Sequence, residues 1–264
     1  MSAAALLLGD SRFPAGGHAH SGGVEPAVTA GTVDDLDTLE VFLRGRLRTS
    51  GLLTSAVAAA ACAHVRQAVA RRGADQELTA PVPDDYWVRL DAETDARTPA
   101  PAQREASRRQ GRALLRAARV AWPDAGWLAE LAASAAGRGG AGGPPLRGST
   151  GGGAVRDEYR GGPHHAVVLG AVAAAAGCTP GEAARIAAYQ AVAGPASAAV
   201  RLLALDPMRV TGVLARLAGE VDQVAGDGAG YAGRPLDDLP CPSAPALELL
   251  AETHFGAEVR LFES

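Results

Sequence analysis

The chain has no lysine and few cysteine or aromatic residues. All 25 basic side chains among its 264 residues are arginine. A phosphate-binding loop of the GxxxxGK[ST] type needs a lysine, so the chain is not a GTPase or ATPase of that class. The three cysteines, Cys62, Cys178 and Cys241, are far apart and form no CxxC pair. This number and spacing indicate small buried thiols in a reducing compartment, not a disulfide framework or a zinc knuckle.

The chain also lacks the usual signals for a membrane or a nucleic acid. Its N-terminus has no basic region before a short apolar run, so we expect no secretory signal. The longest apolar stretch, residues 166–177, is too short to span a bilayer. The net charge of −4 and a pI near 5.9 differ from those of general nucleic-acid binders. We therefore expect a cytoplasmic protein with no membrane and no nucleic-acid partner.

Alanine and glycine dominate the composition, with 59 and 33 residues, whereas aromatic residues make up 4%. Alanine is the best helix former, and alternating β-branched residues are scarce, which predicts an all-α fold. A hydrophobic fraction of 47% and a charged fraction of 20% are sufficient for a packed core. We expect one all-α domain over residues 1–264, a bundle of roughly eight to ten helices.

Apolar spacing and helix-end signals predict where the helices lie. Thr179-Pro180 followed by Glu182 forms a capping box, and Asp206-Pro207 repeats the signal of a cap before a proline. Gly51 is expected to break the chain between two helices, and Gly194-Pro195 to kink or interrupt another. The expected helices cover residues 34–50, 52–72, 84–96, 102–121, 125–136, 164–177, 179–205, 206–225 and 244–254.

Two segments have a biased composition. Residues 137–162 hold 11 glycines and a Pro-Pro pair, which predicts a flexible loop. The helix expected over 102–121 carries arginines at spacings of three and four, which predicts a solvated, positively charged face. These arginines are Arg104, Arg108, Arg112, Arg116 and Arg119.

The densest group of polar and metal-binding side chains lies in the N-terminal segment GDSRFPAGGHAHSGGVE, residues 9–25. His18 and His20, with Asp10 and Glu25 nearby, offer imidazole and carboxylate ligands to zinc, nickel or copper. The alternative is that the glycines shape a tight loop in which Asp10 or Ser21 binds backbone N–H groups. Two histidines alone make a weak metal site, so we predict none, with His18 and His20 as weak candidates.

No motif of an enzyme is present. The sequences GxSxG, SxxK and HExxH are absent. Cys62 and His64, two residues apart on an expected helix, diverge too far to form a catalytic pair. His164 and His165 also diverge, so one is expected at a helix start and the other facing the core. We predict no catalytic residue and no cofactor.

The C-terminal tail, residues 258–264, is unusual for a chain end. Chain ends are normally polar and frayed. This one holds Arg260, Leu261 and Phe262 close to the terminal carboxylate. Two interpretations stay open. The tail packs back on its own core, or it docks on a partner through an aromatic anchor and an arginine.

Segments along the whole chain resemble the UreF family of urease accessory proteins. Residues 9–25 are similar to the family signature D-S-x-x-P-x-G-x-x-x-H-S-x-G-x-E, although His18 stands where the family has phenylalanine. The family often has Leu-Gly-Gln after its central R-L pair, where this chain has Leu-Asp-Pro at 205–207. The other matching segments are REAS at 104–107 with QG at 110–111, HH at 164–165 with Gly170, SAAVRL at 197–202, PALE at 245–248 with His254, and RLFES at 260–264.

The resemblance implies an all-α, non-catalytic protein of urease maturation that forms a homodimer. In the family, UreF binds UreD, called UreH in some systems, and their complex recruits the GTPase UreG to deliver nickel to the urease apoprotein. The tail becomes ordered on contact with UreD. The alternatives are a nickel carrier that uses His18 and His20, or a regulator of the GTPase activity of UreG. The candidate partner-binding residues are Phe13, Pro14, His20, Ser21, Glu25, Arg201, Glu248, His254, Arg260, Leu261 and Phe262.

Overall fold

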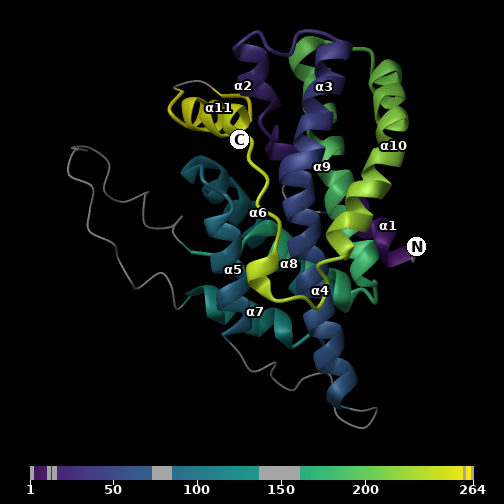
Figure 1. The fold of residues 1–264 in the computed structure, drawn as a ribbon, viewed down its shortest axis with the longest axis vertical. Helices are drawn as coiled ribbons and strands as arrows, with labels where there is room; N and C mark the ends of the chain where they lie inside the picture. The colour runs from purple at the N-terminus through teal and green to yellow at the C-terminus, as the bar shows by residue number, and fades with distance from the viewer. Residues whose placement is uncertain are drawn as a thin grey trace, which may run out of the picture.

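The computed structural model describes residues 3–10, 13, 17–72, 85–136, 161–257 and 260–262. These ranges consist of helices and the turns between them, without a β-strand, which confirms the predicted all-α bundle (Figure 1). The α-helices are α1 (Ala3–Gly9), α2 (Val24–Thr29), α3 (Leu36–Arg46), α4 (Leu52–Arg72), α5 (Tyr86–Ala96), α6 (Pro101–Ala121), α7 (Trp127–Ala136), α8 (His165–Ala175), α9 (Pro180–Leu203), α10 (Pro207–Ala229) and α11 (Pro245–Phe255). Short 3-10 turns, η1 (Gly17–Ala19) and η5 (Leu236–Asp238), connect some of them.

The expected break at Gly51 is wrong, because α3 and α4 form one continuous rod. A capping box between Asp35 and Thr38 starts α3, and the π-helical turn η2 (Leu47–Gly51) joins it directly to α4. Gly51 is buried, and a Cβ there would lie 3.4 Å from the Ala191 Cβ of α9. The glycine therefore allows two helices to approach closely instead of ending one.

The expected interruption at Gly194-Pro195 is also absent, since α9 continues through it. A proline inside a helix removes the N–H that would bind the carbonyl four residues earlier. That carbonyl, of Ala191, accepts a hydrogen bond from Arg46 Nε at 3.1 Å instead. An arginine from the rod thus replaces the missing donor, and the helix continues.

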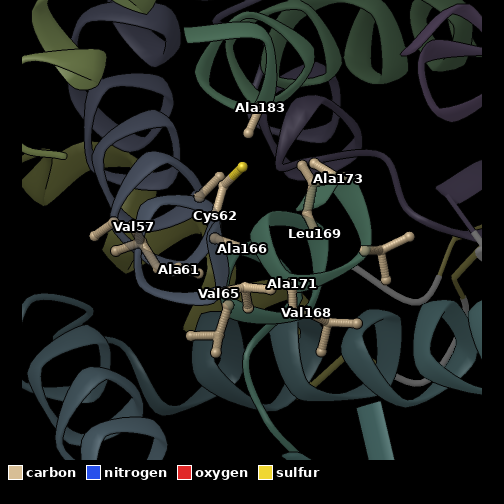
Figure 2. Packing of buried hydrophobic residues seen from close by; sticks show 14 of the residues in the cluster. Val57, Ala61, Cys62, Val65, Ala166, Val168, Leu169, Ala171, Ala173 and Ala183 are labelled. Carbon is tan, nitrogen blue, oxygen red and sulfur yellow. The ribbon is translucent and has the colours of Figure 1, made fainter. Parts of the chain in front are cut away.

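The helix α8 lies at the centre of the bundle, as its all-round apolar sequence predicts. All its residues from Ala166 to Ala173 are buried, and it packs against α4 and α6. Figure 2 shows small side chains of α4, among them Cys62, facing those of α8. A Cβ on Gly170 would lie 2.6 Å from the Ala61 Cβ and closer still to the Ala58 carbonyl oxygen. Glycine at this position lets the two helix backbones touch.

The rod is apolar enough to be compared with a membrane-spanning helix. By length and composition, Leu36–Arg71 could cross a membrane. However, 67% of its most apolar window is buried inside the protein. The apolar part of the rod thus packs inside the bundle.

Several smaller expectations have mixed outcomes. Cys62 and Cys178 are buried as predicted, and the Cys62 thiol donates to the Cys178 carbonyl oxygen at 3.4 Å, whereas Cys241 is exposed.

The short helices α1 and α2 were not predicted, because too few residues repeat in them to give a periodic signal. The expected flexible loop lies outside the described residues, except for Gly161 and Gly162.

Replacing Gly170 by alanine is expected to lower the free energy of unfolding by about 1–3 kcal/mol, because the added methyl group meets the α4 backbone. Urea unfolding measures this change. In the matched control Gly219→Ala, on α10, nothing lies within 4 Å of the added Cβ. This control is expected to be neutral or stabilised by up to about 1 kcal/mol. Equal unfolding free energies for the two variants would contradict the close α4–α8 packing.

Candidate functional site

A polar cluster, buried except for the partly exposed Asp95, joins α5, α6 and α8. Arg108 of α6 binds Asp91 Oδ2 at 2.9 Å and Asp95 Oδ2 at 2.6 Å, both on α5. His164, the residue before α8, donates its backbone N–H to Asp91 Oδ1 at 2.8 Å. Its Nε2 lies 2.8 Å from Asp95 Oδ1, and its Nδ1 lies 3.0 Å from the Ser107 hydroxyl. Since a carboxylate only accepts, Nε2 carries a proton.

The cluster resembles two kinds of functional centre. Ligand atoms of Asp91, Asp95 and His164 lie within 4.8 Å of one another, as in a metal site. Burial raises the pKa of Asp95, but the hydrogen bond and charge of His164 and the charge of Arg108 outweigh it and hold the pKa at about 2. The Arg108 guanidinium already pairs with both carboxylates and would repel a cation there. The residues therefore do not fit a metal.

The order Ser107–His164–Asp95 also resembles a hydrolase triad. The imidazole is fully buried, and the Ser107 oxygen already accepts the backbone N–H of His165 at 3.2 Å. A nucleophile must be free to approach a substrate carbonyl, and this serine oxygen is held against two groups of its own chain. The contacts of the cluster join α5, α6 and the start of α8.

The cluster brings two sequence motifs together. The REAS segment at 104–107 supplies Ser107, and the HH segment at 164–165 supplies both histidines. Four residues further along α6, a Cβ on Gly111 would lie 3.1 Å from the carbonyl carbon of His164 and closer to the Pro163 oxygen. Glycine is needed there so that the start of α8 can rest on α6.

The expectation of a solvated arginine face on α6 is wrong for its first half. Arg104 donates to the carbonyl oxygens of Thr98 and Pro99. Arg108 is in the buried cluster, and Arg112 donates to the Gly161 carbonyl oxygen at 2.7 Å. Beyond them, Arg116 and Arg119 are exposed as predicted. The spacing puts the arginines on one face, but the neighbouring elements decide which of them reach water.

Of the C-terminal tail the structure describes residues 260–262, which fold back onto the chain near the point where α11 lies beside α2 (Figure 1). Glu25 of α2 accepts the backbone N–H groups of Leu261 and Phe262 at 2.7 and 3.0 Å. His254 of α11 lies 3.3 Å from the Phe262 carbonyl oxygen and 3.5 Å from Glu25 Oε2. The Phe262 ring is buried in the core, 4.6 Å below the Arg201 guanidinium. Five predicted site residues therefore meet around the tail.

The same region also presents apolar side chains to solvent. Leu261 is 77% exposed, and Leu249 and Phe255 on α11 are exposed as well. The Arg260 guanidinium lies 5.9 Å from the centre of the Phe255 ring. The tail thus packs back on its own core through Phe262, as the first interpretation predicts, whereas docking on a partner stays a prediction.

The remaining predicted residues have separate positions. Ser21 is fully buried, and its hydroxyl accepts a backbone N–H at the start of α2. Glu248 accepts the backbone N–H that precedes α11. Phe13 is half-buried and packs against the aromatic residue that ends α6. Pro14 and the side chain of His18 lie outside the described residues, so a His18–His20 pair stays a prediction.

A cleft of about 960 Å³ opens between the N-terminal segment, the rod, α6, α9 and α11. Its walls include His20, His165, His254, Arg46 and Arg201. Burial, together with the charge of His20, lowers the pKa of His165 to about 4, so this imidazole is neutral at pH 7. Burial also lowers the pKa of Arg46, to about 10, so its guanidinium stays charged at neutral pH.

Sequence reasoning missed Arg46 and the carboxylates of the buried cluster. For Arg46 a signal existed, because Pro195 leaves a carbonyl of a buried helix without its donor. For Asp91 and Asp95 the spacing of four residues places both on one helix face. That spacing is common on solvated helices, so it did not distinguish a buried cluster from an exposed one.

The change Glu25→Gln is expected to release the tail, because a neutral amide oxygen replaces a charged acceptor of two backbone N–H groups. Hydrogen bonds to charged groups contribute about 1.5–3 kcal/mol. Hydrogen exchange of the C-terminal peptide should therefore accelerate by about tenfold or more. The control Asp222→Asn removes only an exposed ion pair with Arg185. Unchanged exchange in the glutamine variant would show that Glu25 does not hold the tail.

Comparison with known proteins places the chain among urease accessory proteins. The UreF family model matches residues 33–218. The urease accessory protein UreF of Mycobacterium tuberculosis (strain H37Rv) is 43% identical over 249 residues, which are 94% of this chain and 92% of that protein. Those of Mycobacterium sp. (strain JLS) and Mycobacterium marinum are 41% and 40% identical over 259 residues, 98% of this chain and 97% of each relative. The similarity covers nearly the whole length of each protein.

Proposed function

Because the chain belongs to the UreF family of urease accessory proteins, we propose that it serves urease maturation as a non-catalytic scaffold. Its accessory role follows from relatives that are similar over almost their full length. The proposed partners are a UreD/UreH-type protein, a UreG-type GTPase and the urease apoprotein, and the chain acts in the cytoplasm as a homodimer. The buried contacts favour a scaffold, because the groups that resemble catalytic or metal-binding centres are engaged with one another.

One domain over residues 1–264 suits this role. The rod and α9 contribute to both clusters of buried apolar side chains, so the two halves of the core share helices. The tail, residues 258–264, is the proposed docking segment. Its exposed Arg260 and Leu261 carry this assignment, since arginine and apolar anchors are typical of protein interfaces. Phe262 and Glu25 hold the segment in position for a partner.

The nickel-carrier alternative has less support. His20 is 6% exposed, at the wall of the cleft. Among the described side chains, the one group of potential metal ligands does not include His20, and it pairs with Arg108. Regulation of a UreG-type GTPase is compatible with a scaffold, because a docked protein can alter the activity of its partner.

Urease co-expressed with its accessory proteins should contain little nickel and show little activity when this chain is omitted. Adding the chain back should restore both the nickel content, measured by elemental analysis, and the activity. In equilibrium dialysis against nickel, the scaffold hypothesis expects His18→Ala and His20→Ala to bind as the original protein does. Full nickel occupancy of urease without this chain would refute a role in maturation.

The change Leu261→Asp should weaken association with a UreD-type protein by about tenfold or more, because it places a charge on the outward face of the tail. Association is measured by calorimetry with the purified partner. The matched control Val120→Asp alters an equally exposed apolar residue at the end of α6, distant in sequence from the tail. Helical circular dichroism should be unchanged in both. Equal affinities for both variants would remove the tail from the docking surface.

A further inference from the structure

Arg46 lines the cleft, and no carboxylate of the described residues pairs with it. It is the last residue of α3, and its Nε donates to the Ala191 carbonyl oxygen at 3.1 Å. Among the described ion pairs it has no acidic partner. A guanidinium carries five N–H donors, and the described hydrogen bonds of Arg46 use one of them. A desolvated charge without a counter-charge is unfavourable, which makes Arg46 a candidate for binding an anion.

The other two arginines of the cleft, Arg97 and Arg201, already contact other groups of the chain. Arg97 pairs with Glu93 and donates to the carbonyl oxygens of Leu239 and Asp237. Arg201 stacks on the buried ring of Phe262. Arg46 differs from both, because its guanidinium rests against backbone instead of an acid or a ring. A Cβ on Gly22 would lie 3.2 Å from its central carbon.

The surroundings of Arg46 suit a negatively charged ligand. The π-helical turn η2 directly follows Arg46, and such turns occur frequently at functional sites. Ser50, within that turn, also lines the cleft and offers a hydroxyl donor. Three arginines line the cleft against two acidic residues, Asp10 and Glu248, although the whole chain has a net charge of −4. Since Arg97 pairs with Glu93, Arg46 and Arg201 balance the two acidic residues, and the lining has no net negative charge that would repel an anion.

We propose that the cleft binds a small free oxyanion of the carboxylate or phosphate class at the Arg46 guanidinium. Two parallel N–H groups of a guanidinium match two oxygens of such an anion, and the Ser50 hydroxyl supplies a further donor. His20 and His165, on the walls of the same cleft, are additional hydrogen-bonding groups. The site does not depend on the role in urease maturation, so either proposal can fail without the other.

Arginine modification tests the site on the unaltered protein. Since the chain has no lysine, phenylglyoxal modification of its basic side chains reports on arginine alone, and peptide mass spectrometry resolves each position. Inorganic phosphate or acetate should slow the modification of Arg46, by about tenfold at ten times the Kd of the anion. Sodium chloride of equal ionic strength is the control. The engaged Arg97 and the exposed Arg209 should react at rates that the anions do not change.

Two outcomes overturn the proposal. One is an Arg46 that reacts equally fast in phosphate, acetate and chloride. The other is an Arg46 that reacts more slowly than Arg97 in chloride, which would show that its guanidinium does not face the cleft. Protection of Arg46 alone supports the site.

A variant provides a second measurement. Phosphate should raise the Tm of the original protein and leave that of Arg46→Gln unchanged, because ligand binding to the folded state stabilises it. An equal rise in both proteins would contradict the assignment to Arg46. The change also removes the donor to the Ala191 carbonyl. If the variant does not fold, the phenylglyoxal experiment on the original chain decides whether an anion binds at Arg46.

Discussion

The backbones of α4 and α8 touch where Gly170 faces Ala58, and this contact sets the spacing of the central helices. A chain with 4% aromatic residues has few large rings to fill wide gaps in its core, so its helices must approach closely. Alanine and glycine make this approach possible, and dispersion contacts over long helices replace the contribution of large side chains. The positions of the polar cluster, the cleft and the tail depend on this spacing.

Polar contacts then fix the outer helices to this apolar centre. Arg108, two carboxylates and His164 hold α5 and α6 against the start of α8. Such a cluster is stable only when its groups are satisfied together, and removing one member leaves a buried charge. Its resemblance to a metal site or a hydrolase triad comes from the same residue types, but their mutual pairing gives it a structural role.

The tail combines an internal attachment with an outward surface. Glu25 and Phe262 hold it to the bundle, whereas Leu261 faces solvent. A segment held in this way loses less conformational entropy when a partner binds than a free chain end would. This pre-organisation is consistent with a scaffold that acts through contacts and not through chemistry.

The sequence by itself determined the features that depend on neighbouring residues. The capping box of Thr179 and Glu182, the start of α10 at Asp206 and the burial of α8 all follow from contacts or periodicity within one helix, and the structure confirms them. The family resemblance depends on the order of short motifs along the chain, and the comparisons confirm it as well.

The tertiary structure decided the features that depend on residues far apart in sequence. Pro195 ends no helix because Arg46, 149 positions earlier in the printed sequence, supplies a donor to Ala191. Gly51 allows the rod to pack closely against α9. Arg108 is largely buried because it forms an ion pair with Asp91 of α5. Local propensity describes the preference of an isolated segment. A carbonyl, a cavity or a charge contributed by a distant helix can reverse that preference, and only the packed chain shows where this happens.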